Sequence, residues 1–324
     1  MNKTNGSYKV LAIVQNYEND GEAHFTAHQG SVILDVQGAR GMLAISAADL
    51  NGDRLPDVVA VGGGFFVVAE NQGDFQFEQS LVQMVGDQAD PFIFLTLAIG
   101  DVDGNGLLDM VLPSASRSST GSSPDPNIYF GGPDFVLLQH EDGFVESAEL
   151  YSEGEGSRSQ LATLSDRDGD GDLDVFIPAD LGPPSAFWRN DGLDGDGTLV
   201  LVDDAAEISA DVVIAAMGID NTDLNGDGAL DYVISDVGPP RVLLSDGQGG
   251  FVDSGRSLGL SVEEISEEGF STVGWSVDLV DFIKRRFDMC VAAACYPEGH
   301  PDAADLQSDV EHAKRKVDAG ADLF

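Results

Sequence analysis

Positive charge is scarce in this 324-residue chain, in which 16 Lys and Arg residues stand against 57 Asp and Glu, for a formal net charge of −41. So large an acidic excess argues against nucleic acids and anionic membrane surfaces as partners. No apolar run approaches the length of a membrane span. The first residues contain no apolar segment of the kind found in signal peptides, so secretion is not predicted from them.

Thiols and histidines are also few, and none of them suggests a catalytic centre. Cys290 and Cys295 lie five residues apart on a strand-like run, so their side chains point to opposite faces, which disfavours a disulfide or a shared metal ion. His24, His28 and His140 are isolated in the sequence. No Ser-His-Asp or Cys-His arrangement is recognisable.

What the chain has instead is a nine-residue acidic loop in four copies, with oxygen-bearing side chains at loop positions 1, 3, 5 and 9. The sixteen candidate metal ligands are Asp49, Asn51, Asp53 and Asp57; Asp101, Asp103, Asn105 and Asp109; Asp166, Asp168, Asp170 and Asp174; and Asp223, Asn225, Asp227 and Asp231. Such spacing suits Ca²⁺, which takes six to eight oxygens on a curved loop, with a position-7 carbonyl as a further ligand. Glycine at position 6 permits a positive φ, although Arg54 replaces it in the first copy. About four Ca²⁺ sites are predicted.

Two alternatives to calcium loops have to be distinguished. An EF-hand shares the first half of the spacing but needs a bidentate Glu at position 12 and flanking helices. Position 12 is apolar in every copy, which excludes the EF-hand: it is Ala60, Leu112, Ile177 and Ile234. Solvated turns without metal are the other alternative, because Asp, Asn and Gly favour turns. Four copies at matched positions favour metal binding.

Each acidic loop is followed by a short β-branched or aromatic run, which predicts a buried strand after each loop. These runs cover residues 58–61, 110–112, 175–177 and 232–234. The loops recur at steps of 52, 65 and 57 residues, a period typical of propeller blades. Residues 8–35 suggest the outer strands of an incomplete preceding blade, and the Ser/Pro/Gly-rich residues 114–126 suggest a surface insertion.

Together these loops, strands and Gly-rich turns over residues 8–282 resemble FG-GAP/VCBS repeats, the calcium-loop blades of integrin-α-type β-propellers. The resemblance implies a mainly β fold, an incomplete β-propeller of about four calcium-loop blades. It implies a binding or interaction module for a protein or glycan partner that the sequence does not identify, and an extracellular location.

The repeat stops where a fifth loop is due, because Asp281-Phe282 is followed by Ile-Lys-Arg-Arg instead of an acidic loop. Residues 283–324 contain six basic and eight acidic side chains, so the preceding 282 residues hold only ten of the 16 basic ones and 49 of the 57 acidic ones. So abrupt a change predicts two unlike segments, residues 1–282 and 283–324.

The second segment predicts a strand, a loop and a helix, one β/α unit. Its Tyr-Pro-Glu-Gly-His-Pro run from Tyr296 and its Lys-Arg-Lys-Val-Asp-Ala-Gly run from Lys314 resemble methylenetetrahydrofolate reductase, an FAD-dependent TIM barrel. By this resemblance, seven residues stand at FAD-contacting positions: Tyr296, His300, Ala303, Asp309, His312, Arg315 and Lys316. A complete barrel needs at least about 200 residues, so the segment resembles one unit of a TIM barrel.

The sequence thus favours a calcium-binding β-propeller-type interaction module joined to a partial reductase segment, and not an enzyme as this chain alone. The alternative is an FAD-dependent, cytoplasmic methylenetetrahydrofolate reductase of one-carbon metabolism, reducing 5,10-methylenetetrahydrofolate with electrons from NAD(P)H and present here as a fragment. A chimera without a joint function is a third possibility.

Overall fold

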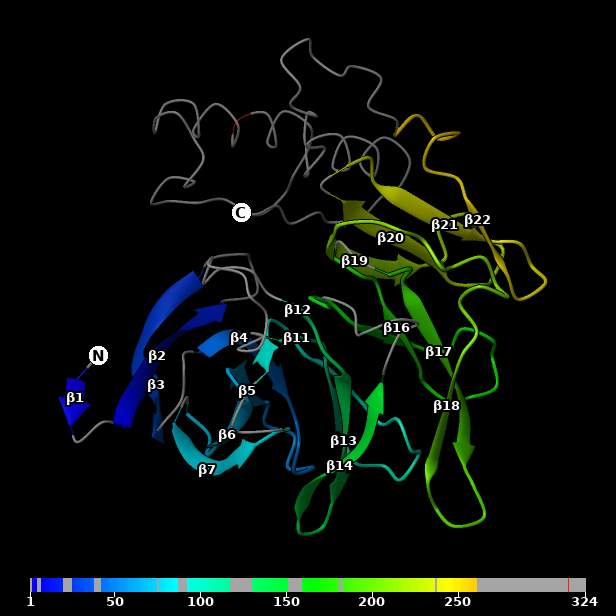
Figure 1. Ribbon diagram of the computed structural model, residues 1–324. Coiled ribbons are helices and arrows are strands. Elements are labelled where there is room, and N and C mark those ends of the chain that lie inside the picture. Colours follow the sequence, from blue (N-terminus) through cyan, green and yellow to red (C-terminus); the bar gives the residue numbers. More distant parts are fainter. Residues whose placement is uncertain are drawn as a thin grey trace. The chain divides into compact units, whose positions relative to one another are not determined.

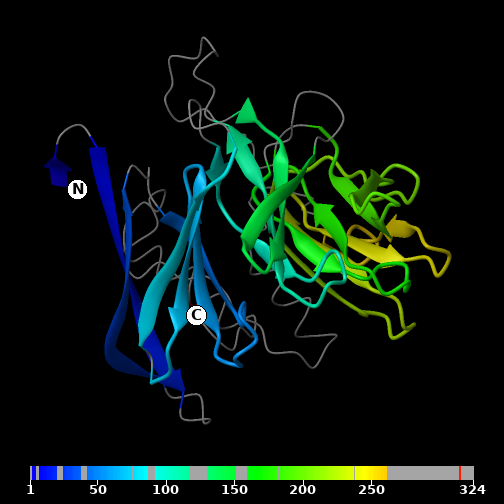
Figure 2. The same cartoon turned by 90° about the horizontal axis from the view of Figure 1, so that it is seen from below.

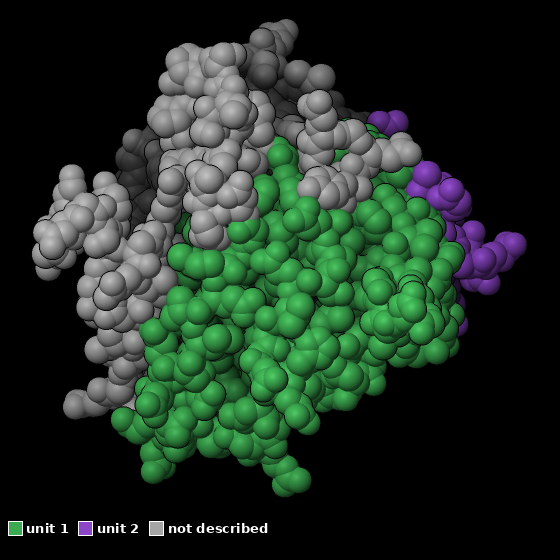
Figure 3. All heavy atoms as spheres, turned by 60° about the horizontal axis from the view of Figure 1, so that its bottom comes forward, with its two compact units in different colours: residues 1–205, 211–213 green, residues 206–210, 214–324 purple. Residues whose placement is uncertain are grey.

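The computed structural model describes residues 2–4, 7–19, 25–37, 42–74, 76–86, 92–116, 130–150, 159–180, 183–236, 238–260 and Lys314. Within these ranges the chain is almost entirely β, with helical geometry at Lys314 alone, which confirms the predicted mainly β fold. The chain divides into two compact units, residues 1–205 with 211–213 and residues 206–210 with 214–324 (Figure 3). None of the described residues forms a helix long and apolar enough to cross a membrane.

Four antiparallel sheets of four strands each dominate the fold (Figure 1). The first sheet contains β4 (Met42–Ala48), β5 (Asp57–Gly62), β6 (Phe65–Asn71) and β7 (Phe77–Met84). The second contains β9 (Ala98–Gly100), β10 (Asp109–Leu112), β13 (Asp134–His140) and β14 (Gly143–Leu150). The third contains β15 (Thr163–Ser165), β16 (Asp174–Ile177), β17 (Ala186–Leu193) and β18 (Leu199–Asp203). The fourth contains β19 (Ala216–Thr222), β20 (Asp231–Asp236), β21 (Arg241–Ser245) and β22 (Phe251–Asp253).

In each of these sheets an acidic loop joins the first strand to the second. The first to fourth acidic loops are residues 49–57, 101–109, 166–174 and 223–231. The ninth loop residue is the first residue of the second strand, and the apolar run after it is that strand, as predicted. Within each sheet the strands pair in the order in which they occur in the chain, although β11 and β12 of another sheet lie between β10 and β13 in sequence, so the four sheets share one topology.

Two smaller sheets complete the described structure. One consists of β1 (Asn2–Thr4), β2 (Ser7–Asn19) and β3 (Phe25–Gln37), which confirms strands within residues 8–35. The other consists of β8 (Ile93–Phe94), β11 (Ser114–Ser116) and β12 (Phe130–Gly131). The predicted surface insertion is therefore wrong at its start, because Ser114 and Ala115 are buried strand residues. The buried backbone N–H of Ser114 has an acceptor there, because it donates to Asp134 Oδ1 at 2.7 Å.

The core of the first unit is built by sheets packing face to face (Figures 1 and 2). Successive residues of a strand point to opposite faces, so β10 contributes side chains to two hydrophobic clusters, one on each face of the second sheet. Met110 and Leu112 pack with side chains of the first sheet, where Phe66 and Phe144 meet edge to face at 5.3 Å. Val111 packs with side chains of the third sheet. β10 is thus covered on both faces, which is why all three of its residues after Asp109 are apolar.

The fourth sheet has its own core in the second unit. On one face Val242 packs with Leu224, Leu244 and Leu260, the last of which follows β22. Tyr232 is fully buried, and its ring meets that of Phe251 edge to face at 5.4 Å.

A buried carboxyl group lies at the start of β13. Asp134 is almost fully buried, and its Oδ2 accepts a hydrogen bond from Ser159 Oγ at 2.9 Å. Burial raises the pKa of Asp134 to about 8, although the hydrogen bonds from Ser114 and Ser159 act in the opposite direction. Between about pH 4 and pH 8 the unfolded chain therefore ionises this group while the folded chain keeps it protonated.

We expect Asp134→Asn to remove part of the pH dependence of stability. Between about pH 4 and pH 8, unfolding of the wild type releases the proton that Asp134 holds in the folded chain. The free energy of unfolding of the wild type should therefore fall, relative to that of the variant, by about 1.4 kcal/mol for each unit by which the pH rises. Urea unfolding of both chains across this range measures the difference. A constant difference from pH 4.5 to pH 8 would contradict the raised pKa.

Candidate metal centres

The carboxylate at loop position 1 organises each acidic loop by accepting hydrogen bonds from its backbone. In the first loop, Asp49 Oδ1 accepts from Gly52 N at 2.8 Å and Asp49 Oδ2 from Arg54 N at 2.8 Å. Asp166 and Asp223 accept from the same two loop positions, 4 and 6, at 2.7–3.1 Å. The three loops therefore curve around their first residue in the same way.

The second loop differs at this carboxylate. Asp101 Oδ2 accepts from Gly106 N at 2.9 Å, but Asp101 Oδ1 is buried and finds no hydrogen-bond partner among the described residues. A buried carboxylate oxygen without a donor costs free energy comparable to a lost hydrogen bond or more. An ion is the natural partner for such an atom.

Loop position 6 requires a left-handed backbone in every copy. Gly106, Gly171 and Gly228 have φ values of 89°, 101° and 90°, as predicted for glycine there. Arg54 occupies the same position with φ of 71°, a conformation that costs a side-chain-bearing residue about 1–2 kcal/mol. Its N–H nonetheless donates to Asp49, so the first loop keeps the shared geometry.

The position-9 aspartates lie beneath the loops, and all four are fully buried: Asp57, Asp109, Asp174 and Asp231. Each accepts a backbone N–H from loop position 2 through Oδ2, at 2.7–3.1 Å. Each also accepts a backbone N–H from the third strand of its sheet through Oδ1, at 2.7–2.9 Å. One side chain thus connects the loop and two strands.

Burial and hydrogen bonding act in opposite directions on the pKa values of three of these carboxyl groups. Burial raises the pKa of Asp57 and of Asp109, and raises that of Asp174 to about 6. At the surface the opposite holds, because the N–H of Gly228 lowers the pKa of Asp223. A nearby cation would favour the ionised form of Asp57, Asp109 and Asp174.

The structure brings several predicted ligands together. Among the described residues, two groups hold carboxylate oxygens within 4.8 Å of one another: Asp101, Asp103 and Asp109 of the second loop, and Asp166, Asp168 and Asp170 of the third. Two asparagines among the predicted ligands donate a hydrogen bond to a neighbouring aspartate: the asparagine at position 5 of the second loop and the one at position 3 of the fourth. Asn105 Nδ2 lies 3.1 Å from Asp103 Oδ2, and Asn225 Nδ2 lies 2.9 Å from Asp227 Oδ2.

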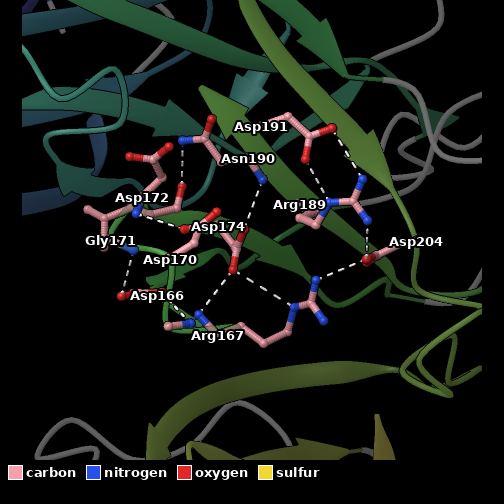
Figure 4. Close-up of polar contacts among 12 residues, drawn as sticks. Asp166, Arg167, Asp170, Gly171, Asp172, Asp174, Arg189, Asn190, Asp191 and Asp204 are labelled. Atoms are coloured by element: carbon pink, nitrogen blue, oxygen red, sulfur yellow. Dashed lines mark hydrogen bonds and ion pairs between the residues drawn. The ribbon is translucent and has the colours of Figure 1, made fainter. Parts of the chain in front are cut away.

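The third loop has an additional ionic network, shown in Figure 4. Arg167, at loop position 2, directs its side chain between Asp174 and Asp204, with Nη2 2.9 Å from Asp204 Oδ2. Its guanidinium group also lies 5.0 Å from the centre of the Phe187 ring. Arg189 contacts Asp204 as well, at 3.4 Å. In the other loops an apolar residue takes position 2.

Two site residues were missed by sequence reasoning, Gln139 and Asn190. Their N–H groups bind the buried aspartates, and their side-chain amides bind backbone carbonyls of a neighbouring acidic loop. An alignment of the four repeats on the Gly-containing turn after the third strand would have found them. Gln139 and Asn190 stand shortly before that turn in their repeats, as Asn71 and Ser245 do in theirs.

Comparison with known families gives two separate matches. The family model described as an FG-GAP-like repeat matches residues 49–112, which include the first and second acidic loops. The family model for methylenetetrahydrofolate reductase matches residues 262–324. The two matched segments do not overlap. The suspected resemblance to both families is thereby confirmed.

The curated relatives that this chain resembles include reductases matched over short stretches. The 5,10-methylenetetrahydrofolate reductase of Salmonella typhimurium is 47% identical over 47 residues, which are 14% of this chain and 16% of the relative. That of Buchnera aphidicola from Acyrthosiphon pisum is 40% identical over 55 residues, 17% of this chain and 19% of the relative. The chain spans less than a fifth of the length of these relatives.

Among solved structures, an Agrocybe aegerita lectin described as recognising non-reducing terminal N-acetylglucosamine is similar, with a TM-score of 0.43 and 18% identity over 76% of this chain and 65% of that one. A likeness of this degree does not define a shared ligand. The seven residues predicted to contact FAD lie outside the described residues: Tyr296, His300, Ala303, Asp309, His312, Arg315 and Lys316.

We expect Arg54→Gly to stabilise the protein by about 1 kcal/mol, because glycine adopts the left-handed conformation of position 6 without strain. Chemical unfolding at fixed calcium measures the change. Arg256→Gly is the control, since Arg256 is exposed and has no positive φ, so this change should destabilise. Equal effects of the two changes would contradict the assignment of strain to Arg54.

Proposed function

We propose that residues 1–282 form a calcium-binding interaction module, with one Ca²⁺ site in each acidic loop. The observation that carries this proposal is the pair of features in the second loop: three clustered carboxylates and a buried Asp101 Oδ1 without a hydrogen-bond partner among the described residues. The oxygen donors of the loops are of the kind that a hard divalent cation prefers.

The residues at positions 1, 3 and 5 would hold the cation, joined in the second loop by the buried Asp109, which lies in one cluster with Asp101 and Asp103. When bound, Ca²⁺ would neutralise part of the loop's charge and tie its turns together. The same ion would favour the ionised form of Asp109 and Asp174, whose pKa values are raised by burial. Metal binding and folding are coupled in such an arrangement.

The four sheets of shared topology support a propeller-type arrangement, with each sheet as one blade of an incomplete β-propeller. Such blades serve as platforms on which loops contact a partner. The large acidic excess favours a protein or glycan partner with basic or hydroxyl-rich groups. An extracellular location suits this function, because millimolar calcium would fill even weak sites.

We expect calorimetric titration to find several Ca²⁺ per chain, and Asp101→Asn to reduce the number of bound ions by one. The control is Asp194→Asn, which changes an aspartate that accepts backbone N–H groups in the β17–β18 turn but belongs to no carboxylate cluster among the described residues. Calcium should also raise the melting temperature of the wild type. Binding that is absent, or lost equally in both variants, would sink the proposal.

A second candidate function is an FAD-dependent reductase, which the match over residues 262–324 favours. We expect this chain not to retain FAD after gel filtration, because a TIM barrel needs at least about 200 residues and the segment offers one β/α unit. Flavin absorbance of the purified chain after incubation with FAD provides the measurement. Retained flavin that is lost on His300→Ala would instead favour the reductase, and a cytoplasmic location with it.

A further inference from the structure

Gln139 connects the second acidic loop to the first, across two sheets. Its N–H donates to the buried Asp109 of its own sheet at 2.8 Å. Its side-chain Nε2 donates to the carbonyl of Leu50 at 2.9 Å, and Leu50 is position 2 of the first loop. The N–H of Leu50 in turn donates to Asp57, the buried aspartate of the first sheet. A continuous hydrogen-bonded path therefore joins the two buried aspartates.

Asn190 repeats this arrangement one sheet further along. Its N–H donates to the buried Asp174 of the third sheet at 2.8 Å, and its Nδ2 donates to the carbonyl of Val102 at 2.7 Å. Val102 is position 2 of the second loop, and its N–H donates to Asp109 at 2.7 Å. The same connection is thus built twice, from a third strand to the preceding loop.

We propose that Gln139 and Asn190 are positioning residues that couple the cation sites of neighbouring sheets in the first unit. This inference rests on the calcium function proposed above. Because a peptide group is planar, holding the Leu50 carbonyl also fixes the backbone nitrogen of Asn51, a ligand of the first loop. The Val102 carbonyl fixes Asp103 of the second loop in the same manner.

Coupling follows from the two bonds that each of these residues makes. A cation bound in the second loop would order Asp109, and with it the backbone of Gln139. The side chain of Gln139 would then hold the first loop in its binding conformation, so occupancy of one site lowers the entropic cost of ordering the next. Outer-shell hydrogen bonds of this kind commonly change metal affinity by about 10–100-fold.

The test is Gln139→Met, which removes the amide and keeps the length of the side chain. Hydrogen exchange with mass spectrometry, on the full chain at increasing calcium, resolves residues 49–57 from the other loops. We expect the calcium concentration that protects the first loop to rise about tenfold, although no ligand of that loop is changed. The fourth loop, in the second unit, should keep its wild-type midpoint.

Gln83→Met is the matched control. Gln83 Nε2 donates to the carbonyl of Phe144 at 3.1 Å, so it also joins the first and second sheets, but it contacts no acidic loop through this bond. A shift of the first loop's midpoint in Gln139→Met alone supports the coupling. An unchanged midpoint, or an equal shift in the control, overturns it.

Failure of the proposed calcium function can be told apart from failure of this inference. If the wild type shows no calcium-dependent protection in any loop, the proposed calcium function fails. Hydrogen exchange of the two variants is then compared without calcium, in the presence of a chelator. Faster exchange of residues 49–57 in Gln139→Met than in Gln83→Met then supports the positioning role by itself. Equal exchange in the two variants overturns it.

Discussion

The fold depends on a buried carboxylate bound by two backbone N–H groups, which occurs once in each of the four large sheets. Burying an ionised carboxyl group costs several kcal/mol unless hydrogen bonds replace its water. Here one donor comes from the loop above and the other from the third strand, so the loop and two strands meet at a single side chain. Removing that side chain would leave two buried N–H groups without partners, which is costly in itself.

This constraint also shapes the loops. Both oxygens of the ninth residue are engaged by the backbone, whereas the side chains at positions 3 and 5 are exposed, apart from the half-buried Asp103. The first residue is partly engaged too, and only in the second loop does one of its oxygens lack a donor among the described residues. The four loops therefore have a similar backbone conformation but differ in the number of side-chain oxygens that accept no backbone N–H. We expect their cation affinities to differ for this reason.

Local pattern was enough to predict much of this arrangement. The loop positions, the positive φ at position 6 and the strand after each loop follow from spacing and turn chemistry, which act over a few residues. Gln139 and Asn190 escaped notice because their amides reach carbonyls 89 and 88 residues away in the sequence. The burial of Ser114 was missed for the same reason, since its partner Asp134 is 20 residues distant and a Ser/Pro/Gly-rich composition suggests only a loop.

The third loop shows how charge is balanced within the repeat. The first, second and fourth loops each contain one asparagine among the four predicted ligands, Asn51, Asn105 and Asn225, whereas the third contains only aspartates. The third loop is also the one with an arginine at position 2. Arg167 is almost fully buried, with its guanidinium group near both Asp174 and Asp204. The additional carboxylate is therefore accompanied by a cation from the chain itself. The ion pair with Asp204 offsets part of the desolvation cost of burying the guanidinium group of Arg167.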